Sequence, residues 1–194
     1  MAPRAPRPDE EATTRGDTDF RRRLALIFLL GLALRVAYVL LVERGDPLSG
    51  DGVYYHEAAN LLADGLGFTE PYRYLHGGAQ ELLFVADPSS ITASANTALP
   101  VGHVEPTAGH PPLWVLVLGF SPLLGLTTGA AHQMLGALVG ALGGAAVGWA
   151  GRTLDGPSTG LIAAGLAAVH ACLWLSDGLV MSESLVVTGT ALLV

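Results

Sequence analysis

The stretch RRRLALIFLLGLALRVAYVLLV, residues 21–42, decides the fold of this 194-residue chain. Residues 24–42 are apolar except for Arg35. At about 1.5 Å per residue, a helix of this length crosses the roughly 30 Å hydrocarbon core of a bilayer. Three arginines precede it, and basic residues that flank a membrane helix stay on the cytoplasmic side. The stretch therefore predicts a membrane helix that runs outward from a cytoplasmic N-terminus.

The composition also indicates a membrane protein. Hydrophobic residues make up 51% of the chain and charged residues 14%, whereas soluble domains carry about 25% charged residues. The net charge of -7 argues against nucleic acid as a partner, because phosphates require a basic face. Residues 1–20 are rich in Pro, Arg and acids and have no periodic apolar pattern, so they are predicted to be a disordered cytoplasmic tail.

Further apolar segments occupy residues 113–126, 132–150, 161–175 and 179–194. We therefore expect an all-α, polytopic membrane helix bundle with about five apolar segments. If each segment crosses, the loop with Arg152 is external, although arginine favours the cytoplasm. The alternative is that residues 113–126, the shortest segment, cross only in part. The chain ends inside an apolar run, so residues 21–194 are expected to be the N-terminal part of a longer membrane domain.

Glycines recur at every fourth position in the segment of residues 132–150, as Gly136, Gly140, Gly144 and Gly148. Such a row of small residues lets the backbone of a neighbouring membrane helix approach closely. The row is therefore predicted to be a structural packing face rather than a site of chemistry.

Residues 44–112 form a long external loop in this topology. Within it, residues 52–64 predict an amphipathic helix that ends at Gly65 and Gly67. Polar residues such as His56 fall on one face and apolar residues such as Tyr55 on the other. This pattern predicts a helix in the membrane interface with its tyrosines at headgroup level. The later part of the loop, residues 71–109, is predicted to hold at most one short helix or strand.

Asp51 stands at the start of this predicted helix, within Gly50-Asp51-Gly52. Aspartate is favoured as an N-cap, where it accepts backbone N–H bonds. A carboxylate at a membrane surface can instead act as a general base toward a hydroxyl or coordinate a hard cation. A divalent cation therefore stays open as a cofactor.

A second group of candidates, His103, Glu105 and His110, precedes the next apolar segment. Histidine and carboxylate side chains at this spacing could ligate zinc. His110 directly precedes two prolines, which places it at the outer end of a helix. There it could donate to a phosphate or orient a sugar, or it could be an ordinary interfacial histidine.

Two charged residues lie within apolar segments. Arg35 either extends to lipid phosphates from the outer end of the first helix or binds the phosphate of a lipid-linked substrate. Asp177 and Glu183 flank the start of the last segment, and Glu183 should face the bundle interior or a wet cavity, because an ionised carboxylate in lipid is costly. The alternative is that Glu183 begins a helix with Ser182 as its cap.

These features in this order resemble a known family. An arginine-flanked helix is followed by Gly50-Asp51-Gly52-Val53-Tyr54-Tyr55-His56, then His110-Pro111-Pro112-Leu113-Trp114, then Ser182-Glu183. The chain is similar, from about residue 21 onward, to the N-terminal part of the dolichyl-phosphate-mannose protein mannosyltransferase and aminoarabinose-transferase-like group in the GT-C superfamily.

The resemblance implies an inverting membrane glycosyltransferase of the bacterial plasma membrane and cell envelope. Such an enzyme takes a sugar from a polyprenyl-phosphate donor and transfers it to a protein or glycan on the outer face. It implies that Asp51 is the catalytic base and that His110 contacts the donor phosphate, with Arg35, Tyr55, His56 and Glu183 as further substrate-binding candidates. Many members carry a second acid directly after the aspartate, where this chain has Gly52. Because family members are longer, this chain alone is expected to be inactive.

Two other classes of protein share some of these features. A transporter or a non-catalytic, lipid-binding membrane subunit could also use a glycine-lined helix and intramembrane acids. A transporter is expected to show inverted repeats with broken helices at matching positions, and the sequence contains no such repeat. The long loop with its tyrosine-lined helix favours the enzyme over the subunit.

Overall fold

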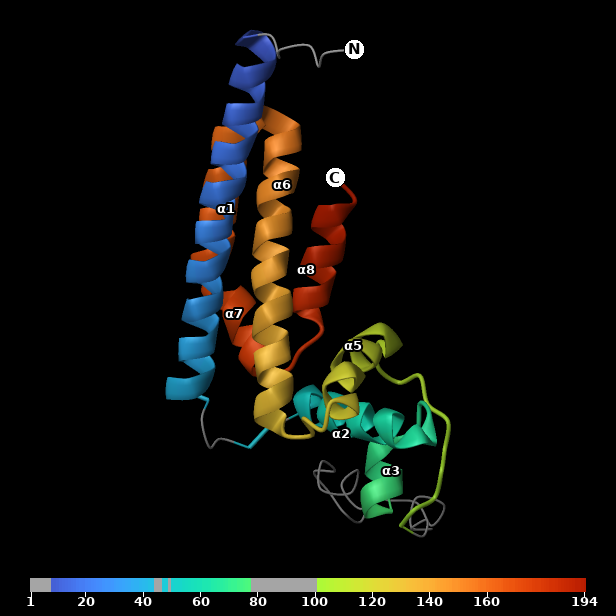
Figure 1. Cartoon of the computed structure of the whole chain (residues 1–194). Coiled ribbons are helices and arrows are strands. Elements are labelled where there is room, and N and C mark those ends of the chain that lie inside the picture. The colour runs from blue at the N-terminus through green and yellow to red at the C-terminus, as the bar shows by residue number, and fades with distance from the viewer. Residues whose placement is uncertain (1–7, 44–46, 49, 78–100) are drawn as a thin grey trace, which may run out of the picture. The chain divides into compact units, whose positions relative to one another are not determined.

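The computed structural model describes residues 8–43, 47–48, 50–77 and 101–194 (Figure 1). Within these ranges the regular elements are helices, and the only β-type pairing is an isolated bridge between Thr69 and Pro106. The all-α prediction is therefore confirmed. The chain forms two compact units. The first comprises Met1–Arg44, Gly136–Gly178 and Glu183–Val194, and the second comprises Gly45–Leu135 and Leu179–Ser182.

The first unit contains helices α1 (Pro8–Leu41), most of α6 (Gly129–Val169), α7 (Ala171–Gly178) and α8 (Glu183–Leu192). Helix α6 is broken at Asp155 and at Gly156, whose φ of 87° is left-handed, directly before Pro157. The chain turns back at this point, and the two arms pack closely (Figure 1), since a Cβ on Gly148 would lie 2.8 Å from the Cβ of Ala164. The predicted segments 132–150 and 161–175 are thus the two arms of a hairpin, the second of which is interrupted at His170.

Helix α1 begins well before the apolar stretch. It starts at Pro8, so the prediction of a disordered tail is wrong for residues 8–20, while residues 1–7 lie outside the described part. The reason is tertiary packing. Phe20 is 2% exposed and contacts Trp149 edge-to-face, and Asp17 forms ion pairs with both Arg21 and Arg152. These contacts anchor the N-terminal turns of α1 on the α6 hairpin.

Side-chain size is distributed across the first unit in an unusual way. Small residues are buried between the helices, among them Ala141, Ala164, Ala167 and Ala168, whereas large apolar residues are exposed, among them Leu29, Leu30, Ile162 and Leu166. Close packing through small residues with large apolar side chains outside is the pattern of helices that pack within lipid. The predicted glycine row belongs to this core, because added Cβ atoms at Gly136, Gly140 and Gly148 would lie within 3 Å of neighbouring atoms.

Two helices of the described chain, Thr14–Leu41 and Gly129–Val169, are long and apolar enough to cross a membrane. The prediction of about five crossing segments is therefore too high. Residues 113–126 form only a 12-residue helix, which is about 18 Å long. The last predicted segment, 179–194, is reduced to the 10 residues of α8, because Val180 at φ 60° interrupts the chain before it.

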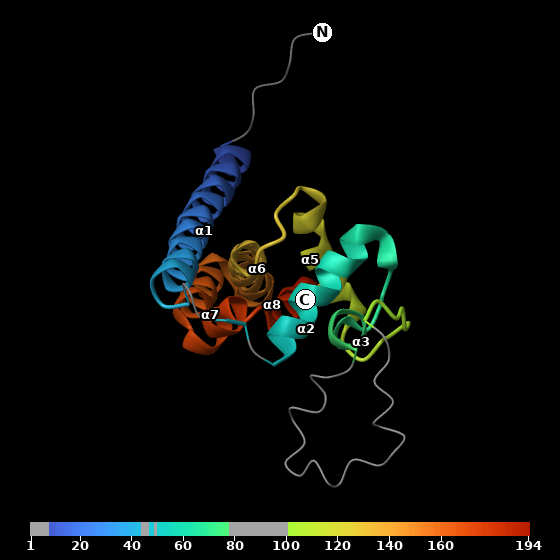
Figure 2. The same ribbon diagram turned by 90° about the horizontal axis from the view of Figure 1, so that it is seen from below.

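The second unit contains helix α2 (Asp51–Leu61), the π-helical turn η1 (Leu62–Leu66), α3 (Pro71–His76) and α5 (Pro112–Leu123). Gly65 at φ 84° and Gly67 at φ 67° end the α2–η1 helix, as predicted. The short helix predicted in the loop is α3. Helices α2 and α5 lie side by side (Figure 2), and Gly119 permits this because a Cβ there would already be 3.2 Å from Leu62.

The tyrosines of α2 are buried within the second unit. Tyr54 and Tyr55 are 4% and 3% exposed, because His110, at the start of the α5 segment, covers both rings. These rings therefore contact protein rather than lipid. The apolar face of α2 is correctly identified, but it packs against protein.

Candidate functional site

Asp51 and His110, the two strongest candidates from the sequence, are in contact. The Asp51 Oδ1 atom lies 3.3 Å from His110 Nε2, and the Asp51 side chain is 57% exposed. Gly50 occupies the N-cap position at φ 55°, and no described side chain caps α2. The alternative that Asp51 is an N-cap is therefore wrong. Its carboxylate stands at the first residue of α2, directed to the histidine and accessible from solvent.

Two tyrosines hold the His110 ring. The Tyr54 ring stacks on it with centroids 3.9 Å apart and planes at 22°, and the Tyr55 ring meets it edge-on at 5.3 Å. The His110 Nδ1 atom is buried in this contact without a hydrogen-bond partner. Because the ring is clamped, Nε2 stays directed at Asp51, and the geometry of the pair is fixed by its surroundings.

The phenols around this pair are donors rather than bases. The Tyr54 hydroxyl donates to Thr107 Oγ1 over 3.5 Å, and the Tyr72 hydroxyl donates to the backbone oxygen of Gly50 over 3.3 Å. Burial raises the pKa of Tyr54, and burial also raises the pKa of Tyr72. Both hydroxyls therefore keep their protons at neutral pH. Asp51 is the exposed carboxylate of this group.

His56, predicted as a substrate-binding residue, has a structural partner that the sequence analysis missed. Its Nδ1 atom lies 2.9 Å from Nδ1 of His132, near the start of α6, and His132 is completely buried. Burial lowers the pKa of His56, which fits a neutral ring that shares one proton with its partner. Nothing local in the sequence could have shown this pairing, because 76 residues separate the two histidines.

The three possible zinc ligands, His103, Glu105 and His110, are not brought together in the structure. Glu105 pairs with Arg73 at 2.7 Å, His110 contacts Asp51, and His103 is exposed. Among the residues that the structure describes, no three His, Cys, Asp or Glu side chains are grouped so that they could hold a metal ion. These three side chains therefore do not form a zinc site, because Glu105 and His110 contact different residues and His103 is exposed.

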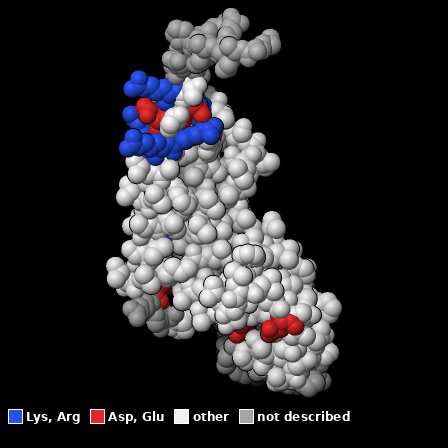
Figure 3. Space-filling model, in the orientation of Figure 1, with Lys and Arg blue, Asp and Glu red and all other residues white. Residues whose placement is uncertain are grey.

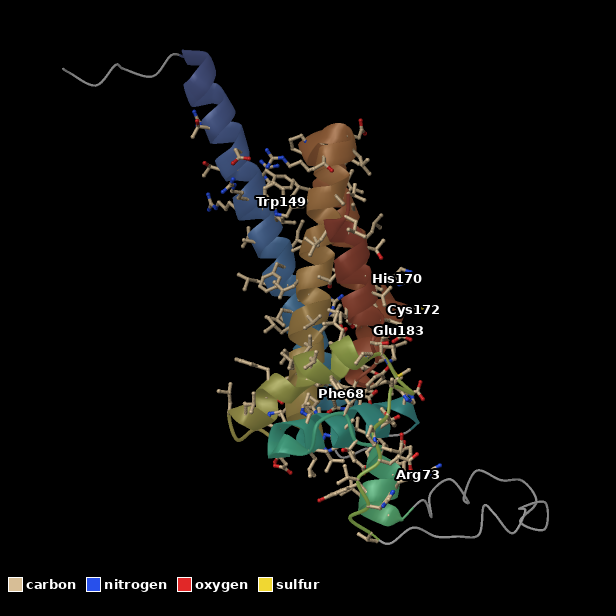
Figure 4. All side chains as sticks on the ribbon, turned by 90° about the vertical axis from the view of Figure 1, so that its right-hand side faces the viewer. Phe68, Arg73, Trp149, His170, Cys172 and Glu183 are labelled. Atoms are coloured by element: carbon tan, nitrogen blue, oxygen red, sulfur yellow. The ribbon has the colours of Figure 1, made fainter. Side chains whose placement is uncertain are left out.

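Helices α2 and α3 carry a further polar contact. Glu57 Oε1 lies 3.7 Å from His76 Nε2, while Glu57 Oε2 is buried without a partner. Burial raises the pKa of Glu57, and the neighbouring His76 opposes this shift. The labelled Arg73 marks α3 in Figure 4. The Arg73–Glu105 and Glu57–His76 contacts attach α3 to the rest of the second unit.

Arg35 is buried in the first unit rather than at a surface. It is 1% exposed, and its Nε atom lies 2.7 Å from Asp177 Oδ2. Its other nitrogens donate to backbone oxygens, at 3.1 Å to Gly31 and at 3.4 Å to Ala167 and Ala168. The prediction that Arg35 extends to lipid phosphates is wrong, because a carboxylate from α7 satisfies it within the helices.

Asp177, not Glu183, is the buried acid near the start of the last segment. The Ser184 hydroxyl also donates to the Asp177 carboxylate, and Asp177 itself is fully buried. Glu183 is the exposed first residue of α8 (Figure 4). The prediction that Glu183 faces the bundle interior is wrong, and the alternative that it begins a helix is correct. Ser184, one residue later, takes the inward position.

The structure therefore brings together Asp51, His110 and Tyr55 in the second unit, with Tyr54 and Tyr72 as additional members. His56 lies on the same helix in a separate contact, and Arg35 and Glu183 belong to the first unit. Comparison of the chain with protein-family models, with curated proteins and with solved structures gives no match.

Proposed function

We propose that this chain belongs to a membrane glycosyltransferase of the GT-C type, which transfers a sugar from a polyprenyl-phosphate donor to a protein or glycan on the outer face of the membrane. The observation that carries the proposal is the contact between the exposed Asp51 carboxylate and the clamped His110 ring. A base for a bulky hydroxyl acceptor must be both accessible and oriented, and Asp51 meets these two conditions.

In the proposed reaction, the acceptor hydroxyl attacks the anomeric carbon of the donor sugar. The new C–O bond forms as the bond from carbon to the phosphate oxygen breaks, and the phosphate leaves with the electron pair. Asp51 takes the hydroxyl proton as a general base, and attack opposite the leaving group inverts the anomeric centre. His110 holds the carboxylate in position through Nε2. Arg35 is not used, because its donors are already engaged.

The residues present do not favour a metal held between paired carboxylates at this site. Gly52 follows Asp51 in the sequence, where many members of the resembled family carry a second acid. The buried residues of α2 include Gly52, so the position cannot accept a carboxylate without displacing its neighbours. The proposal therefore assigns no step to a metal ion.

The membrane part of the proposal is supported by the surface of the first unit. Large apolar side chains along α1 and the returning arm of α6 are exposed, and a contiguous apolar surface of this kind is unusual for a protein in water. Figure 3 shows Arg, Asp and Glu gathered at the N-terminal end of α1, with an uncharged surface along the helices beyond it. In the proposed orientation this charged end lies in the cytoplasm of a bacterial cell.

Replacing Asp51 by Asn tests the proposed function. Asparagine keeps the size of the side chain but cannot accept a proton, so transfer from a polyprenyl-phosphate sugar should fall by at least about 100-fold. Insertion into membranes should be unchanged. The matched control is Asp64→Asn, because Asp64 is an exposed aspartate on the adjoining turn and has no assigned role.

The assay uses the full natural protein in proteoliposomes with a radiolabelled donor. Transfer by Asp51→Asn at the wild-type rate would remove Asp51 from the mechanism. Movement of the labelled donor across the bilayer without any transfer to an acceptor would favour the transporter instead.

A further inference from the structure

Helix α5 carries an exposed apolar face that no contact in the second unit covers. Leu113, Leu116, Phe120 and Leu123 are 59%, 51%, 60% and 68% exposed. Spacings of three, four and three residues place them on one side of the helix. The neighbouring Leu124 is also 63% exposed. The row is therefore a continuous apolar strip along the whole of α5.

The opposite face of α5 is occupied by protein. Trp114 and Leu118 are completely buried, and Val115 is 3% exposed. The Trp114 indole N–H donates to the backbone oxygen of Val180 over 2.9 Å. Gly119 lies against Leu62 and the backbone oxygen of Ala59. One face of α5 is thus fixed to α2, so the exposed strip cannot turn inward without unpacking this contact.

Two properties of α5 indicate what covers the strip. Residues 111–151 contain no Asp, Glu, Lys or Arg, so the strip and its surroundings offer no charge to a protein partner. At about 18 Å the helix is too short to cross a hydrocarbon core of roughly 30 Å. An apolar helix of this length fits a position within the boundary between headgroups and acyl chains.

The chain that follows α5 supports the same position. Only residues 124–128 separate α5 from α6, a helix long enough to cross a membrane. The start of α6 is tied to this part of the second unit, because the Asn60 side chain donates to the backbone oxygen of Thr127 over 3.2 Å. If α6 crosses the bilayer, the short connection keeps the end of α5 near the boundary where α6 begins.

We propose that the exposed strip of α5 is embedded in the outer leaflet of the bilayer, where it contacts lipid acyl chains without crossing the membrane. His110 lies two residues before α5, and Asp51 contacts His110. The embedded strip therefore sets the height of this pair at the headgroup level. The inference rests on the membrane location in the proposed function, but it does not require the transfer reaction.

The test uses spin labels in the full protein, reconstituted in phosphatidylcholine–phosphatidylglycerol vesicles. The exposed Cys172 is first replaced by Ser, and single cysteines are then placed at Leu116 and Phe120. Leu30→Cys on α1, where Leu30 is 71% exposed, is the membrane control, and Asp64→Cys is the water control. Collision rates are measured with oxygen, which enters lipid, and with a polar nickel chelate, which does not.

Labels at Leu116 and Phe120 should collide with oxygen. Their collision rate with the nickel chelate should be at least about tenfold lower than that of Asp64→Cys, since polar complexes are excluded from hydrocarbon. Their depths should be similar and shallow. Three results would each overturn the inference. The labels could collide freely with nickel, they could be shielded from both reagents by protein or by a second copy, or their depths could increase steadily across the full core. If Leu30→Cys is itself open to nickel, the membrane location in the proposed function fails as well.

Discussion

The ion pair between Arg35 and Asp177 is the most demanding contact at the scale of single residues. Both side chains are 1% exposed. The free-energy cost of removing two charges from water must be offset by their mutual attraction and by further hydrogen bonds. Backbone oxygens of Gly31, Ala167 and Ala168 and the Ser184 hydroxyl provide these. The network connects α1, the returning arm of α6, α7 and α8, so it specifies how the four helices of the first unit meet.

Removing one partner should therefore be far more damaging than removing both. Asp177→Asn should lower the free energy of unfolding by about 3–5 kcal/mol, because Arg35 is left as a lone buried charge. The double variant Arg35→Met/Asp177→Leu should recover most of this loss. Unfolding in mixed detergent micelles measures the difference, with Ser184→Ala, expected to lose about 1–3 kcal/mol, as the comparison. Equal losses in the single and double variants would show that the charges are not coupled.

A second residue-scale prediction concerns the His56–His132 contact. The folded-state pKa of His56 lies below its ordinary value of 6.5 because of burial. Between these two values the unfolded chain binds more protons than the folded chain, so stability rises with pH in this window and is lost as the pH falls below about 6.5. Hydrogen exchange of the α2 amides should accelerate over the same range.

The variant His56→Asn provides the control for this pH dependence. It should show a weaker change in α2 exchange between pH 7.5 and pH 5. Glu57, whose pKa burial raises, acts in the opposite direction, since stability falls as the pH rises past its ordinary value. Because Glu57 is present in both proteins, its effect cancels in the comparison. Identical pH profiles for the two proteins would contradict a role for His56.

At the scale of elements, the glycine row of α6 does more than permit close helix packing. A Cβ on Gly140 would lie 2.3 Å from both carboxylate oxygens of Asp177, and a Cβ on Gly136 would lie 2.9 Å from the Asp177 backbone oxygen. Gly144, on the same row, has its nearest neighbour at 3.9 Å. Gly136 and Gly140 therefore leave the space that Asp177 occupies, whereas the packing around Gly144 is looser.

This difference predicts opposite results for two alanine substitutions. Gly140→Ala should lower the free energy of unfolding by about 1–3 kcal/mol, because the Asp177 side chain is held by Arg35 and Ser184 and cannot move aside cheaply. Gly144→Ala should be neutral or stabilising by up to about 1 kcal/mol, because alanine is the better helix former. The two variants are compared by thermal unfolding in detergent. An unchanged stability of Gly140→Ala would indicate that the Asp177 carboxylate can adopt another position.

At the scale of the whole molecule, the first unit places the turn of α6 beside the N-terminal turns of α1. The turn of α6 carries Arg152, which pairs with Asp17 at 2.6 Å and lies over the Phe20 ring. Trp149 lies beside the same end of α1 (Figure 4). The turn therefore lies at the N-terminal end of α1, where the positive-inside preference of Arg152 agrees with that of residues 21–23. This arrangement follows if α5 does not cross the membrane.

Cysteine labelling with a membrane-impermeant maleimide checks this topology in a Cys172→Ser background. Thr18→Cys and Ser158→Cys should react together from the cytoplasmic side, in inverted vesicles. His103→Cys, in the second unit, should react only in right-side-out vesicles. Labelling of Ser158→Cys from the outside would mean that α5 crosses the membrane and would overturn this topology.

The sequence by itself determined the all-α class, the start of α5 and the end of the α2–η1 helix, and it singled out Asp51 and His110, which proved to be in contact. These features depend on local physics: the length of an apolar run, prolines at a helix start, and left-handed glycines at a helix end. Only the tertiary structure decided which polar groups are buried together. Arg35 and Asp177 are 142 residues apart, and His56 and His132 are 76 residues apart. A buried polar side chain must find its partner on whichever helix packs against it, and that choice depends on the arrangement of all the helices at once.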